Sequence, residues 1–255
     1  MKDIIQMTRE EILELKPEEV DRQLTPEEIL YIATTLGAFW SYKYRIMRQK
    51  IGMHAILKSG RHSDGFFISR ILLDIPNIRR ILAAQLAKRM LEVAETEIGG
   101  KVPVEEITSQ LTIIGIPTGA TSLGKEIADI LGCRTSTMEK QDGRLVLTGE
   151  IDPDKPTIFI EDVFTHGTAL TEALKEIYGK YRGAFIVPFV PVILNRGEKT
   201  EIVLEGIGPF TLVPLVHKTI TDWPDHDCPL CPAGSKPIKP KETDENWRLI
   251  TTSQL

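Results

Sequence analysis

The chain has 255 residues, of which 42% are hydrophobic and 26% are charged, and its formal net charge at pH 7 is −5. This composition is typical of a globular protein with a real core, and the length allows one α/β domain with additions or two small domains. The net negative charge argues against a nucleic-acid partner bound by phosphate neutralisation, but it leaves room for a small anionic substrate at a local basic patch.

The chain shows no pattern that directs it to a membrane or an oxidising compartment. Its first residues, MKDIIQMTREE, become acidic and polar at once, unlike a signal peptide. The longest uncharged apolar stretch, residues 183–194, is too short for a membrane helix and contains two prolines. Three cysteines, an odd set, argue against a disulfide framework. We therefore expect a cytoplasmic protein without a membrane partner.

Helical patterns dominate the first part of the chain. Residues 1–50 are expected to form a helical N-terminal extension. Within it, Thr25-Pro26-Glu27-Glu28 combines an N-cap, a proline at the first helical position and acids at the positive end of the helix dipole. An apolar-periodic segment follows from Ile29 to about Met47, and a further helix is expected from Pro76 through Leu91.

From residue 111 onward, apolar runs alternate with helical segments. Strands are expected at 111–116, 133–138, 157–163 and 184–194, and helices at 122–131 and 169–178. This alternation predicts a parallel sheet covered by helices on both faces, with ligands bound at the carboxyl ends of the strands. The main domain is expected to span residues 51–220. The polar, glycine-containing stretch 139–152 predicts a hairpin or mobile flap, and residues 221–255 predict an extended C-terminal arm packed on the domain.

The stretch TIFIEDVFTHGTAL, residues 157–170, is the most informative part of the chain. An apolar strand ends in two adjacent carboxylates, Glu161 and Asp162, and a short loop then opens a helix. Free backbone N–H groups at such a helix start bind phosphate. Two adjacent acids repel phosphate, but they can accept hydrogen bonds from ribose hydroxyls or hold a cation that accompanies a phosphorylated sugar. The pattern therefore predicts a sugar-phosphate site.

Four segments resemble one enzyme family. Residues 158–170 resemble the ribose-phosphate signature of type I phosphoribosyltransferases. LKSGRHSDGFF, residues 57–67, is similar to the N-terminal motif of orotate phosphoribosyltransferases, and ILNRG, residues 193–197, sits where that family has a late strand with an orotate-binding arginine. The tail from Cys228-Pro-Leu-Cys231 to Lys239-Pro240 resembles the end of one bacterial and archaeal branch. The four segments follow the family's order over residues 29–240.

The resemblance implies a type I phosphoribosyltransferase fold, an α/β architecture with a central parallel sheet flanked by helices, plus a small hood built from the N-terminal segment and the late strands. It implies transfer of the 5-phosphoribosyl group from phosphoribosyl pyrophosphate to orotate, giving orotidine 5′-phosphate and pyrophosphate in pyrimidine biosynthesis. Mg²⁺ would bind mainly on the pyrophosphate oxygens rather than on protein side chains. A homodimer is implied as well.

The resemblance also implies roles for individual residues. Asp162, together with Lys140 and Arg144 of the flap, would act in catalysis, the two cations closing over the pyrophosphate. Arg196 would pair with the orotate carboxylate, a task suited to its planar fork of donors. The residues implied to bind substrate are Lys58, Arg61, Phe66, Phe67, Glu161, Asp162, Thr165, His166, Gly167, Thr168, Ala169 and Arg196.

Some residues depart from the family pattern and leave alternatives open. In the phosphate loop, His166 replaces a threonine and Ala169 replaces the last hydroxyl. A phosphoribosyltransferase for another base therefore stays open, as does a non-catalytic protein that senses phosphoribosyl pyrophosphate or a nucleotide.

The cysteines of the tail suggest a second kind of site. Cys228 and Cys231 offer half of a zinc site, which His226 and the distant Cys133 could complete. A tail turn with reduced thiols is the interpretation that we favour from the sequence. Of two further histidines, His62 fits beside an anionic ligand and His54 fits a packed or surface position.

Overall fold

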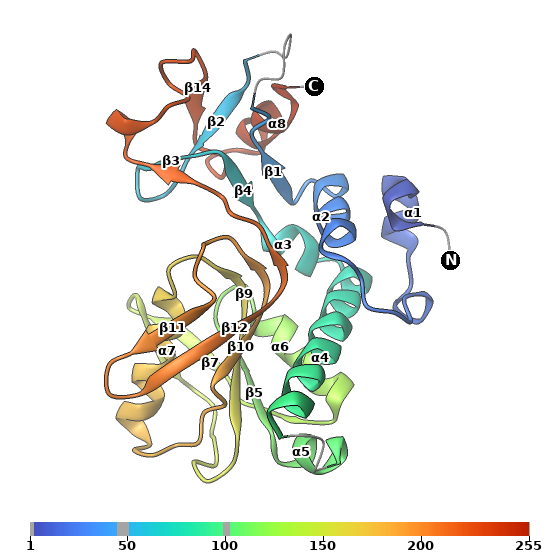
Figure 1. Ribbon diagram of the computed structural model, residues 1–255, viewed down its shortest axis with the longest axis vertical. Coiled ribbons are helices and arrows are strands. Elements are labelled where there is room, and N and C mark those ends of the chain that lie inside the picture. Colours follow the sequence, from blue (N-terminus) through green and yellow to red (C-terminus); the bar gives the residue numbers. More distant parts are fainter. Residues whose placement is uncertain (1–2, 45–50, 99–102, 255) are drawn as a thin grey trace.

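The computed structural model describes residues 3–44, 51–98 and 103–254. It contains an α/β body with a smaller, β-rich part above it (Figure 1). We call the smaller part the hood. It consists of β1 (Phe39–Ser41), β2 (Met53–Ile56), β3 (His62–Ser63), β4 (Gly65–Phe67), β13 (Asp222–Trp223), β14 (Lys236–Ile238) and α8 (Asp244–Thr252).

A central sheet forms the middle of the body, with strand order β11-β12-β10-β9-β5-β6. Neighbouring strands from β12 to β6 run parallel, whereas the edge strand β11 is antiparallel to β12. The predicted parallel sheet is thus confirmed. Its strands are β5 (Thr112–Gly115), β6 (Arg134–Thr135), β9 (Thr157–Phe164), β10 (Phe189–Asn195), β11 (Glu201–Leu204) and β12 (Gly208–His217).

The carboxyl ends of the parallel strands face the hood. After β12 ends at His217, the chain reaches β13 of the hood within a few residues, and Figure 1 shows this segment rising from the sheet. The other parallel strands run in the same direction, so their carboxyl ends lie at the same edge. The hood therefore covers the edge at which parallel sheets bind ligands.

Helices cover both faces of the sheet. On one face, α4 and α6 pack against alternate residues such as Ile158 and Ile160 of β9, and on the other face α7 packs against Phe159. The sequence of β10, FVPVILN, is almost entirely apolar, which suits a strand that is buried along its whole length. The helices of the body are α3 (Ser69–Leu73), α4 (Pro76–Ile98), α5 (Val104–Gln110), α6 (Thr121–Leu131) and α7 (Thr168–Lys180). Within the described residues, no helix has both the length and the apolar character needed to cross a bilayer.

The N-terminal extension contains the helix start that the sequence predicts. Thr25 caps α2 (Pro26–Thr35) in a reciprocal capping box with Glu28. It is preceded by η1 (Ile4–Gln6), α1 (Arg9–Glu14) and η2 (Pro17–Glu19).

The expected helix from Ile29 to about Met47 was wrong in its extent. The helix ends at Thr35, Gly37 adopts a left-handed φ of 76°, and Phe39–Ser41 pairs with β4 as a strand. Its expected last residues, 45–47, lie outside the described residues.

The segment 139–152 begins with the expected hairpin. β7 (Met138–Gln141) and β8 (Arg144–Leu147) are antiparallel and are joined by Asp142 and Gly143, which both have positive φ, as a tight two-residue turn requires. The base of the hairpin is fixed to α7, because Leu147 N–H donates to Glu176 and Lys180 donates to the Leu147 carbonyl. The expected strand 133–138 is instead divided between β6 and the start of β7.

The C-terminal arm is less extended than expected. Residues 221–255 contain β13, η3 (Asp225–Asp227), β14 and α8, and both strands pair with strands from residues 53–63. Local patterns could not indicate this pairing, because its partners lie far apart in the sequence. The division of the chain at residues 50 and 220 stays a prediction.

Candidate active site

Two carboxylates lie at the carboxyl end of β9, as predicted. Glu161 is only 7% exposed, and its Oε2 has no hydrogen-bond partner among the described residues. Burial, together with the charge of Asp162, raises the pKa of Glu161 to about 8. A buried acid without a donor is ready to accept hydrogen bonds from hydroxyl groups of a ligand.

Asp162 is held by groups from two other segments. The Ser69 hydroxyl, at the start of α3, donates to its Oδ2. The loop after β5 approaches so closely that a Cβ on Gly119 would lie 2.0 Å from the same oxygen. This loop contains a cis peptide bond between Pro117 and Thr118. The carboxyl ends of β5 and β9 therefore form one continuous site, with Asp162 between them.

The loop after β9 forms the start of α7. Gly167 is the N-cap with a φ of 77°, and a Cβ there would lie 2.5 Å from Ile202 and 2.9 Å from Phe164. Thr165 is half-buried, whereas His166 and Thr168 are exposed. The N–H groups in the first turn of a helix lack partners within the helix, and the dipole makes that end positive. The loop can therefore hold a phosphate by backbone donors and by the hydroxyls of Thr165 and Thr168.

Arg61 and Arg196 meet at Asp222 of the hood. Arg61 lies in the turn between β2 and β3. Its Nε donates to the Asp222 carboxylate, and its Nη2 donates to the backbone carbonyl of Asp222 at 2.9 Å. Arg196 follows β10, and its Nη2 lies 3.7 Å from Asp222 Oδ2. Three charged groups, widely separated in sequence, thus converge where the hood meets the sheet.

The guanidinium of Arg196 is poorly satisfied for a buried group. Its side chain is 12% exposed, and neither Nε nor Nη2 has a hydrogen-bond partner among the described residues. Burial lowers the pKa of Arg196, although Asp222 and Asp64 oppose that effect. Buried donors without acceptors are costly, so the position favours an anionic or carbonyl ligand.

The aromatic residues of the predicted motif are packed within the protein. Phe66 meets Trp247 edge-on, with ring centroids 6.0 Å apart, and Lys241 Nζ lies 5.5 Å from its centroid. Phe67 lies 6.4 Å from Phe39 and joins the main core. Both rings are only half-buried, so their role beside a pyrimidine stays a prediction.

The predicted cations are brought together only in part. Lys58 is exposed in the turn that also carries Arg61. Lys140 and Arg144 are exposed on the hairpin, at its Lys140↔Leu145 and Gln141↔Arg144 pairs. In the described part of the chain, neither hairpin cation forms a hydrogen bond or ion pair with Asp162, and their catalytic role stays a prediction.

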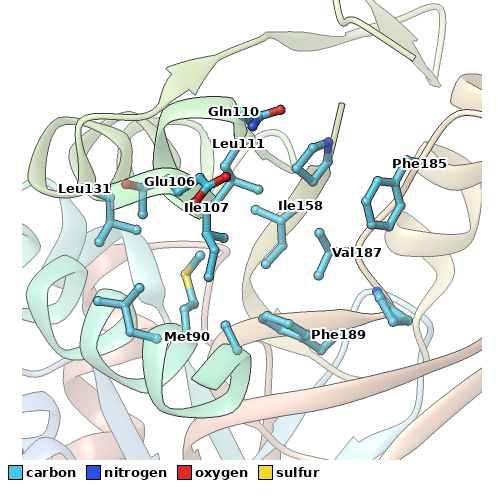
Figure 2. Close-up of a pocket in the computed structure, with 15 residues that line it drawn as sticks. Met90, Glu106, Ile107, Gln110, Leu111, Leu131, Ile158, Phe185, Val187 and Phe189 are labelled. Atoms are coloured by element: carbon cyan, nitrogen blue, oxygen red, sulfur yellow. The ribbon is translucent and has the colours of Figure 1, made fainter. Parts of the chain in front are cut away.

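A large apolar cavity lies at the opposite edge of the sheet. Its volume is about 380 Å³, and it is lined by residues such as Leu111, Ile158 and Phe189, which lie just before or near the amino ends of β5, β9 and β10 (Figure 2). It contains none of the predicted site residues. The chemistry of the carboxyl edge, and not cavity size, therefore locates the candidate site.

Sequence reasoning missed the contacts that three residues make in this site. Asp222 has no local signal, because its importance comes from contacts with residues far away in the chain. Ser69 follows the Phe66-Phe67 motif by two residues, and Gly119 closes the Pro-Thr-Gly loop, but neither pattern indicates contact with Asp162.

Comparison with known proteins relates the chain to one family. The chain is 31% identical to the orotate phosphoribosyltransferase of a Nitratiruptor species over 199 residues, which cover 73% of this chain and 90% of that protein. The chain belongs to the orotate phosphoribosyltransferase family. The orotate phosphoribosyltransferase of Desulforamulus reducens is 28% identical over 84% of this chain and 95% of its own length.

A solved structure of the family shares the fold. The crystal structure of orotate phosphoribosyltransferase from Aeropyrum pernix superposes with a TM-score of 0.52 at 18% identity, covering 74% of this chain and 93% of that one. No protein-family model matches the chain. The predicted type I phosphoribosyltransferase fold is thus confirmed.

Proposed function

We propose that this protein is an orotate phosphoribosyltransferase, which transfers the 5-phosphoribosyl group of phosphoribosyl pyrophosphate to orotate in pyrimidine biosynthesis. Membership of the family supports the transfer reaction. The observation that carries the choice of base is the buried guanidinium of Arg196. Among the described residues, two of its donor atoms lack a hydrogen-bond partner, and it lies at the same sheet edge as the acid pair. A planar carboxylate is the acceptor that such a fork binds best.

The acid pair and the α7 start account for binding of the ribose phosphate. The N–H groups at the start of α7 would hold the 5′-phosphate, and Glu161 and Asp162 would accept hydrogen bonds from the ribose hydroxyls. Positive charge develops at the anomeric carbon as pyrophosphate leaves, and a carboxylate near the ring would stabilise that charge. The ribose would thereby be oriented toward the base below the hood.

The arrangement is compatible with Mg²⁺ bound chiefly by the substrate. Mg²⁺ prefers oxygen ligands and keeps several of its waters. Asp162 and Glu161 offer carboxyl oxygens where the ribose hydroxyls would lie, and Glu161 Oε2 has no hydrogen-bond partner within the described residues. The ion, when bound, would neutralise charge on the departing pyrophosphate. Lys140 and Arg144 of the hairpin would add positive charge there, from the same subunit or from the partner in a homodimer. A cytoplasmic location goes with this function.

The activity is tested by turnover with purified protein. Phosphoribosyl pyrophosphate, Mg²⁺ and orotate are combined, and orotate loss is followed together with pyrophosphate release. We expect stoichiometric conversion of orotate to its nucleotide. Turnover only with another base would overturn the choice of orotate, and binding without turnover would replace the enzyme with a sensing protein.

The role of Arg196 is tested by Arg196→Ala against a matched control. Hydrogen bonds to a charged group contribute ~1.5–3 kcal/mol each, so loss of the two bonds of the fork should lower kcat/KM for orotate by ~100–10,000-fold. The affinity for phosphoribosyl pyrophosphate should change far less. Arg182→Ala removes an exposed arginine after α7 and should leave both parameters unchanged. Equal effects of the two substitutions on orotate would contradict the assignment.

A further inference from the structure

Two histidines and two cysteines of the hood converge on one point. His54 lies on β2, His62 on β3, and Cys228 and Cys231 in the segment between η3 and β14. One ligand atom from each lies within 4.8 Å of every other. His54, His62 and Cys228 are buried, and Cys231 is partly buried.

These partners differ from those considered in the sequence analysis. His226 is 75% exposed and is paired with Asp225 and Asp227, so it does not join the cysteines. Cys133 follows α6 and packs against the core of the body. The two cysteines of the C-x-x-C pair do lie in one cluster of potential ligands, but the histidines of that cluster are more than 160 positions earlier in the chain.

Three nitrogen–sulfur distances in the cluster match those of a tetrahedral site. With Zn–N bonds of about 2.0–2.1 Å and Zn–S bonds of about 2.3 Å, the ligand atoms around one zinc ion lie roughly 3.3–3.8 Å apart. His54 Nε2 lies 3.5 Å from Cys228 Sγ and 3.6 Å from Cys231 Sγ, and His62 Nδ1 lies 3.4 Å from Cys231 Sγ. His54 Nε2 and His62 Nδ1 are 3.0 Å apart, and they would have to move apart by roughly 0.3 Å to reach that range.

A hydrogen-bond chain orients His54 as a ligand. The Ser235 hydroxyl donates to the Gly52 carbonyl at 2.7 Å, so its proton is already committed. His54 Nδ1, 2.8 Å from Ser235 Oγ, must therefore carry the proton and donate it. The lone pair of neutral His54 then lies on Nε2, which faces the cluster. Metal-binding histidines commonly have such a partner on the second nitrogen.

We propose that His54 Nε2, His62 Nδ1, Cys228 Sγ and Cys231 Sγ bind one structural zinc ion in the hood. Two thiolates balance the charge of Zn²⁺, so the assembled site is neutral and suits a buried position. All four positions of the tetrahedron are taken by protein atoms, which is typical of structural rather than catalytic zinc.

The ion would join the N-terminal and C-terminal parts of the hood. His62 pairs with Trp223 in the β3–β13 ladder, and the cysteines follow β13 and precede β14. Asp222, the residue between Arg61 and Arg196, lies in β13 itself. Zinc would thus hold in place the strand whose Asp222 contacts the two arginines.

The first test measures metal in the full-length protein, produced without a histidine tag. Elemental analysis should find about one zinc ion per chain, as a closed site predicts. After removal of zinc, added Co²⁺ should give the intense visible absorption of tetrahedral cobalt with thiolate ligands. The proposal would be overturned if the purified protein contained no zinc and also failed to take up Co²⁺ under reducing conditions. A Cys228–Cys231 disulfide, or iron in place of zinc, would overturn it as well.

Matched variants test the ligand set without depending on activity. Cys228→Ser and His54→Ala should reduce the zinc content at least tenfold, whereas Cys133→Ser and His226→Ala should retain it. Ser235→Ala should keep the fold but weaken zinc binding by ~10–100-fold in a chelator competition. Unchanged affinity in Ser235→Ala together with unchanged zinc content in Cys228→Ser would refute the site, whether or not the protein turns over orotate.

Discussion

The buried carboxyl of Glu161 should make the protein less stable as the pH rises. Its pKa in the folded protein is about 8, against an ordinary value of 4.5. A raised pKa means that the folded state binds the proton more tightly, so the stabilisation is complete below pH 4.5 and is lost as the pH rises through 8. A tenfold difference in proton affinity corresponds to ~1.4 kcal/mol, so the raised pKa of Glu161 should lower the stability of the folded state by ~4 kcal/mol at pH 8 and by ~1 kcal/mol at pH 5, relative to an unperturbed acid.

The substitution Glu161→Gln isolates this effect, because glutamine resembles the protonated acid in shape and charge. Urea unfolding of both proteins from pH 5 to pH 8.5, without ligand, should show the variant gaining ~3 kcal/mol relative to the parent over that range. Because the other titratable groups are the same in both proteins, their contribution cancels in the difference between the two free energies of unfolding. Glu172→Gln, which removes an exposed acid from α7, should show no such pH-dependent gain. A constant stability difference between the Glu161 variant and the parent would refute the reasoning.

Two further predictions concern an ion pair and a close backbone approach. Arg22 bonds Glu28 and lowers the pKa of that carboxyl to about 2, so Glu28→Gln should cost ~2 kcal/mol at pH 7, allowing for water around the half-exposed Arg22. In chemical unfolding, this cost should disappear as the pH falls below 4.5 toward 2. Gly119→Ala should weaken phosphoribosyl pyrophosphate binding at least tenfold, because the new Cβ collides with Asp162. Gly179→Ala in α7, where a Cβ meets nothing within 4 Å, should keep full affinity in the same calorimetric titration and gain up to ~1 kcal/mol in stability. Equal affinities for the two alanine variants would contradict the role given to the close approach at Asp162.

The part of the fold that follows from short-range patterns was predictable. The start of α2 at Thr25 and the strand–loop–helix unit from β9 to α7 depend on neighbouring residues, and the structure has both where the sequence places them. The prediction that α2 continues toward Met47 was wrong, because it followed the helical spacing of apolar residues and gave too little weight to Gly37 as a helix-ending residue. Gly37 ends that helix, and the aromatic residues after it pair as a strand.

The candidate site divides in the same way. Glu161, Asp162 and the phosphate loop occupy a single continuous stretch, so one motif indicates them all. The contact of Asp222 with Arg61 joins residues 161 positions apart, and that of His54 with Cys228 joins residues 174 positions apart. No local pattern carries such information, because the contacts exist only after the chain ends have met in the hood.

This division has a physical consequence for the enzyme. The sugar-phosphate half of the site is part of the sheet and its helices, where β9 is paired on both sides and buried. The half assigned to the base depends on Arg196 meeting a hood whose strands are short and which shares few apolar residues with the main core. Short strands of two to four residues with a small core are marginal alone. A metal that ties β2 and β3 to the segment around β13 would supply the missing stability. Loss of that metal should therefore raise KM for orotate, through displacement of Asp222 and its arginines, more than it raises KM for phosphoribosyl pyrophosphate.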